Sequence, residues 1–254
     1  MHFRSLSILE TSARDESASV TSYRAGLDAI RYHDRLATRW EERYQKASFR
    51  SRLLALTECL DGRDLCRTEW LDAGCGTGTL SRWLAERGCS VFGVDASPRM
   101  IASAAMLAKP GIAPGSLRFQ QVETIARLPV ESRSADGILC SSVLEYVPDP
   151  QACLTEFARV LRPGGVLVVS VPSARSIIRR AQIICNRLGQ LVGKKWAAYL
   201  DYSKHQYLVS EFEGMLQSQD FCLDRVIRFG GPLPRWMQRT PTGSTLAMFS
   251  AIRL

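Results

Sequence analysis

Residues 70–78 read WLDAGCGTG, a short apolar run that ends in an aspartate and three alternating glycines. This pattern predicts a buried strand over residues 69–73 and a tight turn into a helix over residues 79–87. Glycine at this density lets a backbone approach a ligand closely, and the first N–H groups of a helix are free to bind it. The stretch therefore predicts a nucleotide-type site at the carboxyl end of a strand.

Short apolar runs alternate with helical patterns after this turn. Further strands are expected over residues 90–94, 117–122, 137–141, 166–171, 221–229 and 245–252, with helices over 98–108, 150–161 and 210–219. Unbroken apolar strands are typical of a parallel sheet covered on both faces. The connection between the last two strands is too short for a crossover helix, so we expect those two to be antiparallel. The sequence thus predicts an α/β fold: a doubly wound, Rossmann-like, seven-stranded sheet, mostly parallel with an antiparallel C-terminal strand, and helices on both faces.

The 254 residues suit one such domain. We expect a loosely ordered tail over residues 1–22 and one domain over 23–254, which includes a helical cap over 23–66 and a basic amphipathic insertion over 173–209. Eight cysteines occur without a C-x-x-C pair or a Cys/His cluster, which predicts neither a disulfide framework nor a metal site. The N-terminus lacks the apolar core of a signal peptide, and no apolar run reaches transmembrane length, so the expected location is the cytoplasm.

A second motif, VFGVDAS over residues 91–97, places Asp95 at the end of the second strand, 17 positions after Gly78. A carboxylate there suits the two hydroxyls of a ribose, while Ser97 suits the cap of the helix that follows. The loop reads G-x-G-x-G instead of the dinucleotide pattern G-x-G-x-x-G. Asp72, directly before it, would repel a pyrophosphate. These features favour a nucleoside that carries a positive group, such as an ammonium or a sulfonium.

These two motifs, followed by ADGILCSSVLEYVPDPQACLTEFARVLRPGGVLVVSVP over residues 135–172, resemble the successive motifs of class I S-adenosylmethionine-dependent methyltransferases. The resemblance covers about residues 50–172 and includes the small-molecule methyltransferases of ubiquinone and menaquinone biosynthesis. It implies S-adenosyl-L-methionine as cofactor. It also implies that Gly74 and Gly76 approach the methionine part, with Asp72 near its ammonium through the loop or a water. Asp95 would accept the ribose hydroxyls, and Ala96 would lie under the adenine.

The resemblance implies four further contacts with the cofactor. Val122 and Glu123 occupy the position of an apolar contact and an acceptor for the adenine amino group. Ser141, after the fourth strand, would touch the methionine part through its backbone. Arg52 matches an arginine that pairs with the cofactor carboxylate, and Arg50 is the alternative.

The acceptor side is less defined by the sequence. Residues 144–147 read LEYV where the quinone-biosynthesis relatives usually have LEHV, and loss of that histidine counts against a metal-assisted mechanism. Tyr146 either lines the acceptor pocket or packs, and Glu145 is expected to be structural. His205 lies in an aromatic stretch where the family builds its acceptor site, so Tyr146 and His205 are the catalytic candidates. His33 lies in a helix that could cover the cofactor.

Residues 173–192 form an amphipathic pattern with a wide apolar face. Six basic residues and no acidic one lie between Arg175 and Lys195, and the whole chain has a formal net charge of +8. Three interpretations stay open: peripheral contact through residues 175–195 with the inner face of a membrane, a cover for a lipophilic acceptor, or an ordinary helix packed on the sheet.

The expected function is methyl transfer to O, N or C of a small lipophilic or aromatic acceptor. The alternatives are a nucleic-acid or protein methyltransferase that uses the basic surface, and a non-catalytic protein that binds S-adenosylmethionine. A nucleic-acid partner is not expected, because the chain shows no basic motif interleaved with aromatic residues.

Overall fold

The computed structural model describes residues 26–40, 42, 47–108, 116–191, 193–194 and 197–254. The tail expected over residues 1–22 lies outside the described residues. The described part of the chain folds around a seven-stranded sheet in the order β3-β2-β1-β4-β5-β7-β6. The strands are β1 (Glu69–Ala73), β2 (Ser90–Asp95), β3 (Leu117–Gln121), β4 (Ala135–Ser141), β5 (Leu161–Pro172), β6 (Phe221–Phe229) and β7 (Leu246–Arg253).

The first five strands run parallel, and β7 lies between β5 and β6, antiparallel to both. The predicted fold class is therefore confirmed. One detail differs from the expectation. RPGG, over residues 162–165, was expected to close a helix before a strand that begins at Val166, but it lies within β5. Leu161 already pairs with Ala135, and the next pair is Gly137 with Val166, so the RPGG residues form an irregularity inside the strand.

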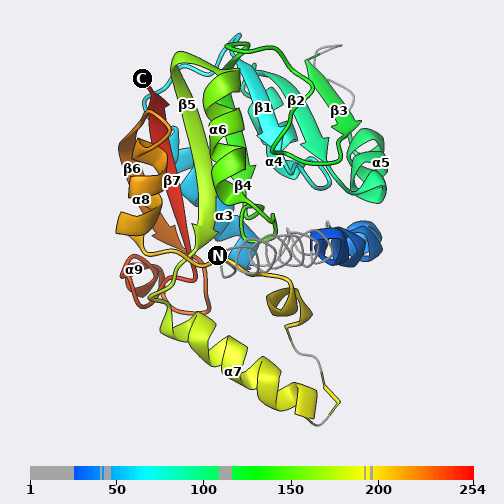
Figure 1. Cartoon of the computed structure of the whole chain (residues 1–254), viewed down its shortest axis with the longest axis vertical. Coiled ribbons are helices and arrows are strands. Elements are labelled where there is room, and N and C mark those ends of the chain that lie inside the picture. The colour runs from blue at the N-terminus through cyan, green and yellow to red at the C-terminus, as the bar shows by residue number, and fades with distance from the viewer. Residues whose placement is uncertain (1–25, 41, 43–46, 109–115, 192, 195–196) are drawn as a thin grey trace, which may run out of the picture.

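Helices cover both faces of the sheet (Figure 1). A helical segment over residues 26–36 leads into η1 (Ala37–Arg39) and α3 (Ala47–Cys59). The other helices are α4 (Thr79–Ala85), α5 (Pro98–Met106), α6 (Pro150–Val160), α7 (Ile177–Leu191), η2 (Ala198–Asp201), α8 (Val209–Gln217) and α9 (Arg235–Gln238). The last of these is a single turn in a connection that the sequence pattern had left without helix.

Two apolar cores lie on opposite faces of the sheet. One joins α6 and α8 to the sheet around Phe157 and Phe212, both completely buried. The other joins α3 and α4 around Leu56 and Leu84. Since every strand except β3 contributes to both cores, the sheet is held rigidly and its carboxyl edge becomes a fixed platform for a site.

Candidate functional site

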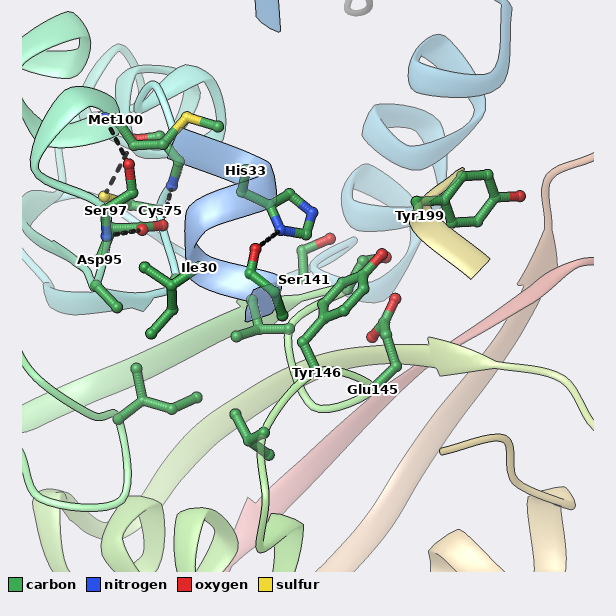
Figure 2. Close-up of a pocket in the computed structure, with 18 of the residues that line it drawn as sticks. Ile30, His33, Cys75, Asp95, Ser97, Met100, Ser141, Glu145, Tyr146 and Tyr199 are labelled. Carbon is green, nitrogen blue, oxygen red and sulfur yellow. Dashed lines mark hydrogen bonds between the residues drawn. The ribbon is translucent and has the colours of Figure 1, made fainter. Parts of the chain in front are cut away.

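A cavity of about 770 Å³ opens at the carboxyl edge of the parallel strands. Its glycine-loop half comprises Gly74, Cys75, Gly76, Asp95, Ala96, Ser97, Met100, Glu123, Thr124, Ile125, Ser141 and Ser142. Its α7 half comprises Glu145, Tyr146, Arg179, Gln182, Tyr199, Gly230, Gly231, Pro232, Thr245 and Leu246. Figure 2 shows Asp95, Ser97 and Cys75 on one side and Glu145, Tyr146 and Tyr199 on the other, with His33 and Ser141 between them.

Backbone hydrogen bonds fix the glycine loop to the end of β2. The N–H groups of Gly74 and Cys75 donate to the Val94 carbonyl at 2.8 and 2.9 Å. Gly74 has φ +80°, and a Cβ atom there would overlap the Val143 side chain. Glycine is therefore required at this position both for the backbone conformation and for the close approach of the β4–α6 loop.

Asp95 ends β2 and accepts one backbone hydrogen bond on each carboxylate oxygen. Gly76 N–H donates to Oδ2 at 2.9 Å, and Ser97 N–H donates to Oδ1 at 2.8 Å. Burial raises the pKa of Asp95, although the amides of Ser97, Gly76 and Ala96 oppose the shift. A carboxylate can accept about four hydrogen bonds, so Asp95 keeps acceptor capacity for donors from the cavity.

Asp72 lies below the glycine loop and is not among the residues that line the cavity. It is 2% exposed, and the Ser81 hydroxyl donates to its Oδ2 at 2.5 Å. Burial raises the pKa of Asp72 to about 7. The structure therefore does not bring Asp72 to the cavity surface, where a direct contact with a ligand ammonium would need it.

Of the other predicted cofactor residues, some line the cavity and one does not. Ala96, Glu123 and Ser141 line the cavity. Val122 does not: it is buried in the core beside α6, and its N–H donates to the Asp95 carbonyl at 3.0 Å. Sequence reasoning misplaced Val122 by position, because the side chain after β3 turns into the core and the next residue faces the ligand side.

Arg52 on α3 reaches the cavity, whereas its alternative Arg50 is exposed and does not line it. The Arg52 guanidinium donates through Nη2 to the Ser142 hydroxyl at 3.0 Å and lies 4.8 Å from the centre of the Phe49 ring. Its buried Nε atom has no hydrogen-bond partner among the described residues. An anionic group bound beside Ser142 would satisfy it.

The helical segment 26–36 lies over the middle of the cavity. His33 Nδ1 is 2.8 Å from the Ala29 carbonyl, and the His33 ring meets the Tyr146 ring edge-on at 4.7 Å. Asp34 of the same segment accepts a hydrogen bond from the Ser97 hydroxyl at 2.7 Å. These contacts place His33 against the cavity, as its expected covering position requires.

Glu145 is the buried acid of the α7 half. It is 3% exposed, and its Oε2 atom has no hydrogen-bond partner among the described residues. Burial raises its pKa to about 7, while the charges of Arg179 and Arg52 act in the opposite direction. A buried carboxyl oxygen without a hydrogen bond is costly in a folded protein, so a ligand that donates a hydrogen bond to Oε2 would stabilise the site.

Arg179 and Gln182 reach the same half of the cavity from α7, and Tyr199 reaches it from η2. The Arg179 guanidinium donates through Nη2 to the Ser203 hydroxyl at 2.6 Å. Sequence reasoning missed Glu145, Arg179, Gln182 and Tyr199. The sequence signal for the α7 residues was the set of polar side chains opposite the apolar stripe of the helix. Periodicity alone does not show which of these two faces turns toward the cavity.

Only one of the two catalytic candidates from the sequence lines the cavity. Tyr146 lines the cavity, and burial together with the Glu145 charge raises the pKa of its phenol, so it stays protonated. His205 does not line the cavity; its Nε2 atom is 3.0 Å from the Val147 carbonyl. His205 therefore supports the β4–α6 loop from behind. Among the described residues, no group of three His, Cys, Asp or Glu side chains could hold a metal ion.

Comparison with known proteins agrees with this geometry. Residues 71–169 match the family model of the methyltransferase domain. A ubiquinone biosynthesis O-methyltransferase from Psychrobacter cryohalolentis is 36% identical over 100 residues, which cover 39% of this chain and 39% of that protein. The chain thus matches about two fifths of the length of this curated relative.

Two solved structures share the fold. A possible histamine N-methyltransferase from Thermotoga maritima has a TM-score of 0.62 at 16% identity and covers 89% of this chain and 100% of that chain. The magnesium protoporphyrin IX methyltransferase from Synechocystis, solved with bound SAH, has a TM-score of 0.58 at 20% identity, with 80% and 81% covered.

The strand order, the glycine loop and Asp95 define a class I methyltransferase fold. Residues 71–169 match the methyltransferase domain, and the chain shares its fold with solved S-adenosylmethionine-dependent methyltransferases.

Proposed function

We propose that the protein is an S-adenosylmethionine-dependent methyltransferase that acts on a small lipophilic or aromatic molecule at O, N or C. The observation that carries the proposal is one continuous cavity, which joins the Asp95 carboxylate to the buried carboxyl of Glu145, whose Oε2 atom has no hydrogen-bond partner among the described residues. A ligand bound on the glycine loop and a second ligand bound at Glu145 would therefore meet inside the same enclosed space.

The glycine-loop half fits S-adenosylmethionine. Gly74 and Gly76 leave room for the methionine part, Asp95 retains acceptor capacity for the ribose hydroxyls, and Arg52 offers a half-buried guanidinium to the carboxylate. The bound cofactor would supply a methyl group on a positively charged sulfur. The protein's own task is then to align the acceptor with that methyl group and to exclude water.

Glu145 is placed to take a proton from the acceptor. For a hydroxyl acceptor, the O–H proton passes to Oε2 of Glu145 while the oxygen forms its bond to the methyl carbon and the sulfur keeps the electron pair of the broken bond. A base works best when its pKa lies near the operating pH, and burial raises that of Glu145 to about 7. Arg179 and Gln182 flank the acceptor and can orient its polar atoms.

The volume of the cavity supports a small acceptor. Ligand pockets typically measure about 300–1,000 Å³, and this one has about 770 Å³ for donor and acceptor together. The relatives are named for three different acceptors, namely ubiquinone intermediates, magnesium protoporphyrin IX and histamine. Because the fold serves all three, the acceptor must be identified from the α7 half of this chain.

Calorimetry with S-adenosylmethionine tests the donor site. Loss of the two ribose hydrogen bonds in Asp95→Ala should weaken binding about 100-fold or more, at roughly 1.5–3 kcal/mol for each bond to a charged group. Asp136→Asn is the matched control, because Asp136 lies on β4 outside the cavity and binds Glu69 N–H and Arg162. Unchanged affinity in Asp95→Ala would rule out the proposed cofactor site.

Turnover separates the proposal from its two alternatives. Incubation with phenolic and amine acceptors should yield S-adenosylhomocysteine and a methylated small molecule. Binding of the cofactor without turnover on any of them would favour a non-catalytic protein. Methylation of RNA or of a peptide in preference to these acceptors would favour the macromolecular alternative.

A further inference from the structure

The helix α7 turns its apolar side to the solvent. Ile177, Ile184, Leu188 and Leu191 are 57%, 58%, 59% and 82% exposed. Their spacing places them on one stripe of the helix, because residues three, four and seven apart share a face. The opposite side carries the buried residues of α7, namely Arg179, Asn186 and Gly189. Of the three interpretations of this segment, an ordinary helix with its apolar face packed on the sheet does not fit this exposure.

Hydrogen bonds to the next segment hold α7 in this orientation. Asn186 Nδ2 donates to the Asp201 carboxylate at 2.9 Å, and Asn186 Oδ1 accepts from the Ala197 N–H at 3.1 Å. Arg179 donates to Ser203 on the cavity side. Rolling the helix to bury its apolar stripe would break all three contacts and strand buried polar groups, so the exposed stripe is a built feature of the fold.

The charge around the stripe selects its partner. Arg175, Arg180, Arg187 and Lys194 are exposed, and residues 173–194 contain no acidic side chain. Pairing α7 with the same helix of a second copy would bring these cations together without compensation. An anionic lipid surface offers apolar chains for the stripe and negative headgroups for the flanking cations.

We propose that α7 binds the interface of an anionic lipid bilayer, with Ile177, Ile184, Leu188 and Leu191 inserted among the acyl chains. Figure 1 shows α7 projecting away from the sheet, which leaves its outer side free for such a contact. Because Arg179 and Gln182 line the cavity from the inner side of α7, the bilayer would adjoin the α7 half. No helix in the described part of the chain is long and apolar enough to cross a membrane.

Vesicle flotation tests this surface on the full chain. One set of vesicles contains phosphatidylcholine alone, and the other contains phosphatidylcholine and phosphatidylglycerol in equal parts. We expect flotation with the anionic vesicles only, weakened by salt because the exposed cations contribute. The double variant Ile184→Ser with Leu188→Ser, here called the α7 variant, should bind the anionic vesicles with a partition constant lower by about tenfold or more. The reason is that two apolar side chains are no longer buried in the bilayer.

Met106→Ser is the matched control, because Met106 is 86% exposed on α5, which lies beside β3 and apart from α7 (Figure 1). It should float like the wild type. Calorimetry with S-adenosylmethionine checks that the α7 variant is folded, and since none of its substituted residues lines the cavity, this readout separates failure of the membrane proposal from failure of the cofactor proposal. Absence of wild-type flotation, or flotation unchanged by the α7 variant, would overturn the proposal. The proposal would also be overturned if the wild type formed a dimer and bound no vesicles, while the α7 variant was a monomer.

Discussion

The glycine-loop half and the α7 half of the cavity are built in different ways. The first is formed largely by backbone groups of consecutive strand ends, fixed by hydrogen bonds such as those from Gly74 and Cys75 to Val94. The second is formed by side chains from the β4–α6 loop, α7, η2 and the β6–β7 connection. A half made of backbone depends on a short motif, whereas a half made of distant side chains can change its specificity one residue at a time.

The largest effect should follow from Glu145→Gln, which keeps the shape of the α7 half but removes its base. We expect the turnover rate to fall about 10²–10⁴-fold while affinity for S-adenosylmethionine stays unchanged. The wild-type rate should rise with pH through about 7, the pKa to which burial raises Glu145, and the variant should lose this limb.

Glu123→Gln is the control for Glu145→Gln, because it makes the same substitution in the glycine-loop half of the cavity. It should change cofactor affinity and leave the pH dependence of turnover in place. A pH limb that persists in Glu145→Gln would show that another group accepts the proton.

A second prediction concerns Asp72, the buried support below the glycine loop. Burial raises its pKa from 3.8 to about 7, so the folded protein binds a proton that the unfolded chain has already released over this range. The resulting stability is fully present below about pH 4 and is lost as pH rises through about 7. Asp72→Asn should remove roughly 4 kcal/mol of this pH dependence, measured by urea unfolding at a series of pH values. Equal slopes in both proteins would contradict it.

A third prediction compares two glycines with the same backbone angle. Gly74 and Gly164 both have φ +80°, but only at Gly74 would a Cβ atom meet another side chain, that of Val143. Gly164→Ala should cost about 1 kcal/mol from backbone strain alone, and Gly74→Ala about 2–3 kcal/mol with loss of cofactor binding. Unfolding and calorimetry measure both. The double variant Gly74→Ala with Val143→Ala should recover part of the difference; no recovery would exclude the clash as the cause.

The smallest effect is expected at His205. Its hydrogen bond to the Val147 carbonyl supports the loop from behind, so His205→Ala should cost about 1 kcal/mol of stability with little change in turnover. A large loss of rate at unchanged stability would place His205 in the α7 half after all.

The glycine-loop half could be predicted from the sequence because its signals are local. Gly74, Gly76 and Asp95 follow directly on apolar strands, and the parallel register of β1 and β2 brings the two strand ends together without any further information. Val122 shows the limit of this reasoning, since a shift of one position after a strand end decides whether a side chain faces the core or the ligand.

The α7 half could not be predicted in the same way. Periodicity shows that α7 has an apolar stripe, but its direction depends on Ser203, Asp201 and Ala197, which bind Arg179 and Asn186. These partners lie beyond the helix, in a segment without a repeating pattern. Glu145 was expected to be structural because a buried acid and a catalytic acid look alike until the atoms around it are known.

The place of β7 between β5 and β6 has a consequence for the order in which the protein is made. Among the described strands β6 pairs only with β7, although residues 221–229 leave the ribosome before residues 246–253. Until β7 has been synthesised and has paired, β6 remains an unpaired strand and Leu246 is missing from the cavity wall. The site is therefore completed in the same late step that completes the sheet, so a released chain truncated before residue 246 should be open to proteases over β6.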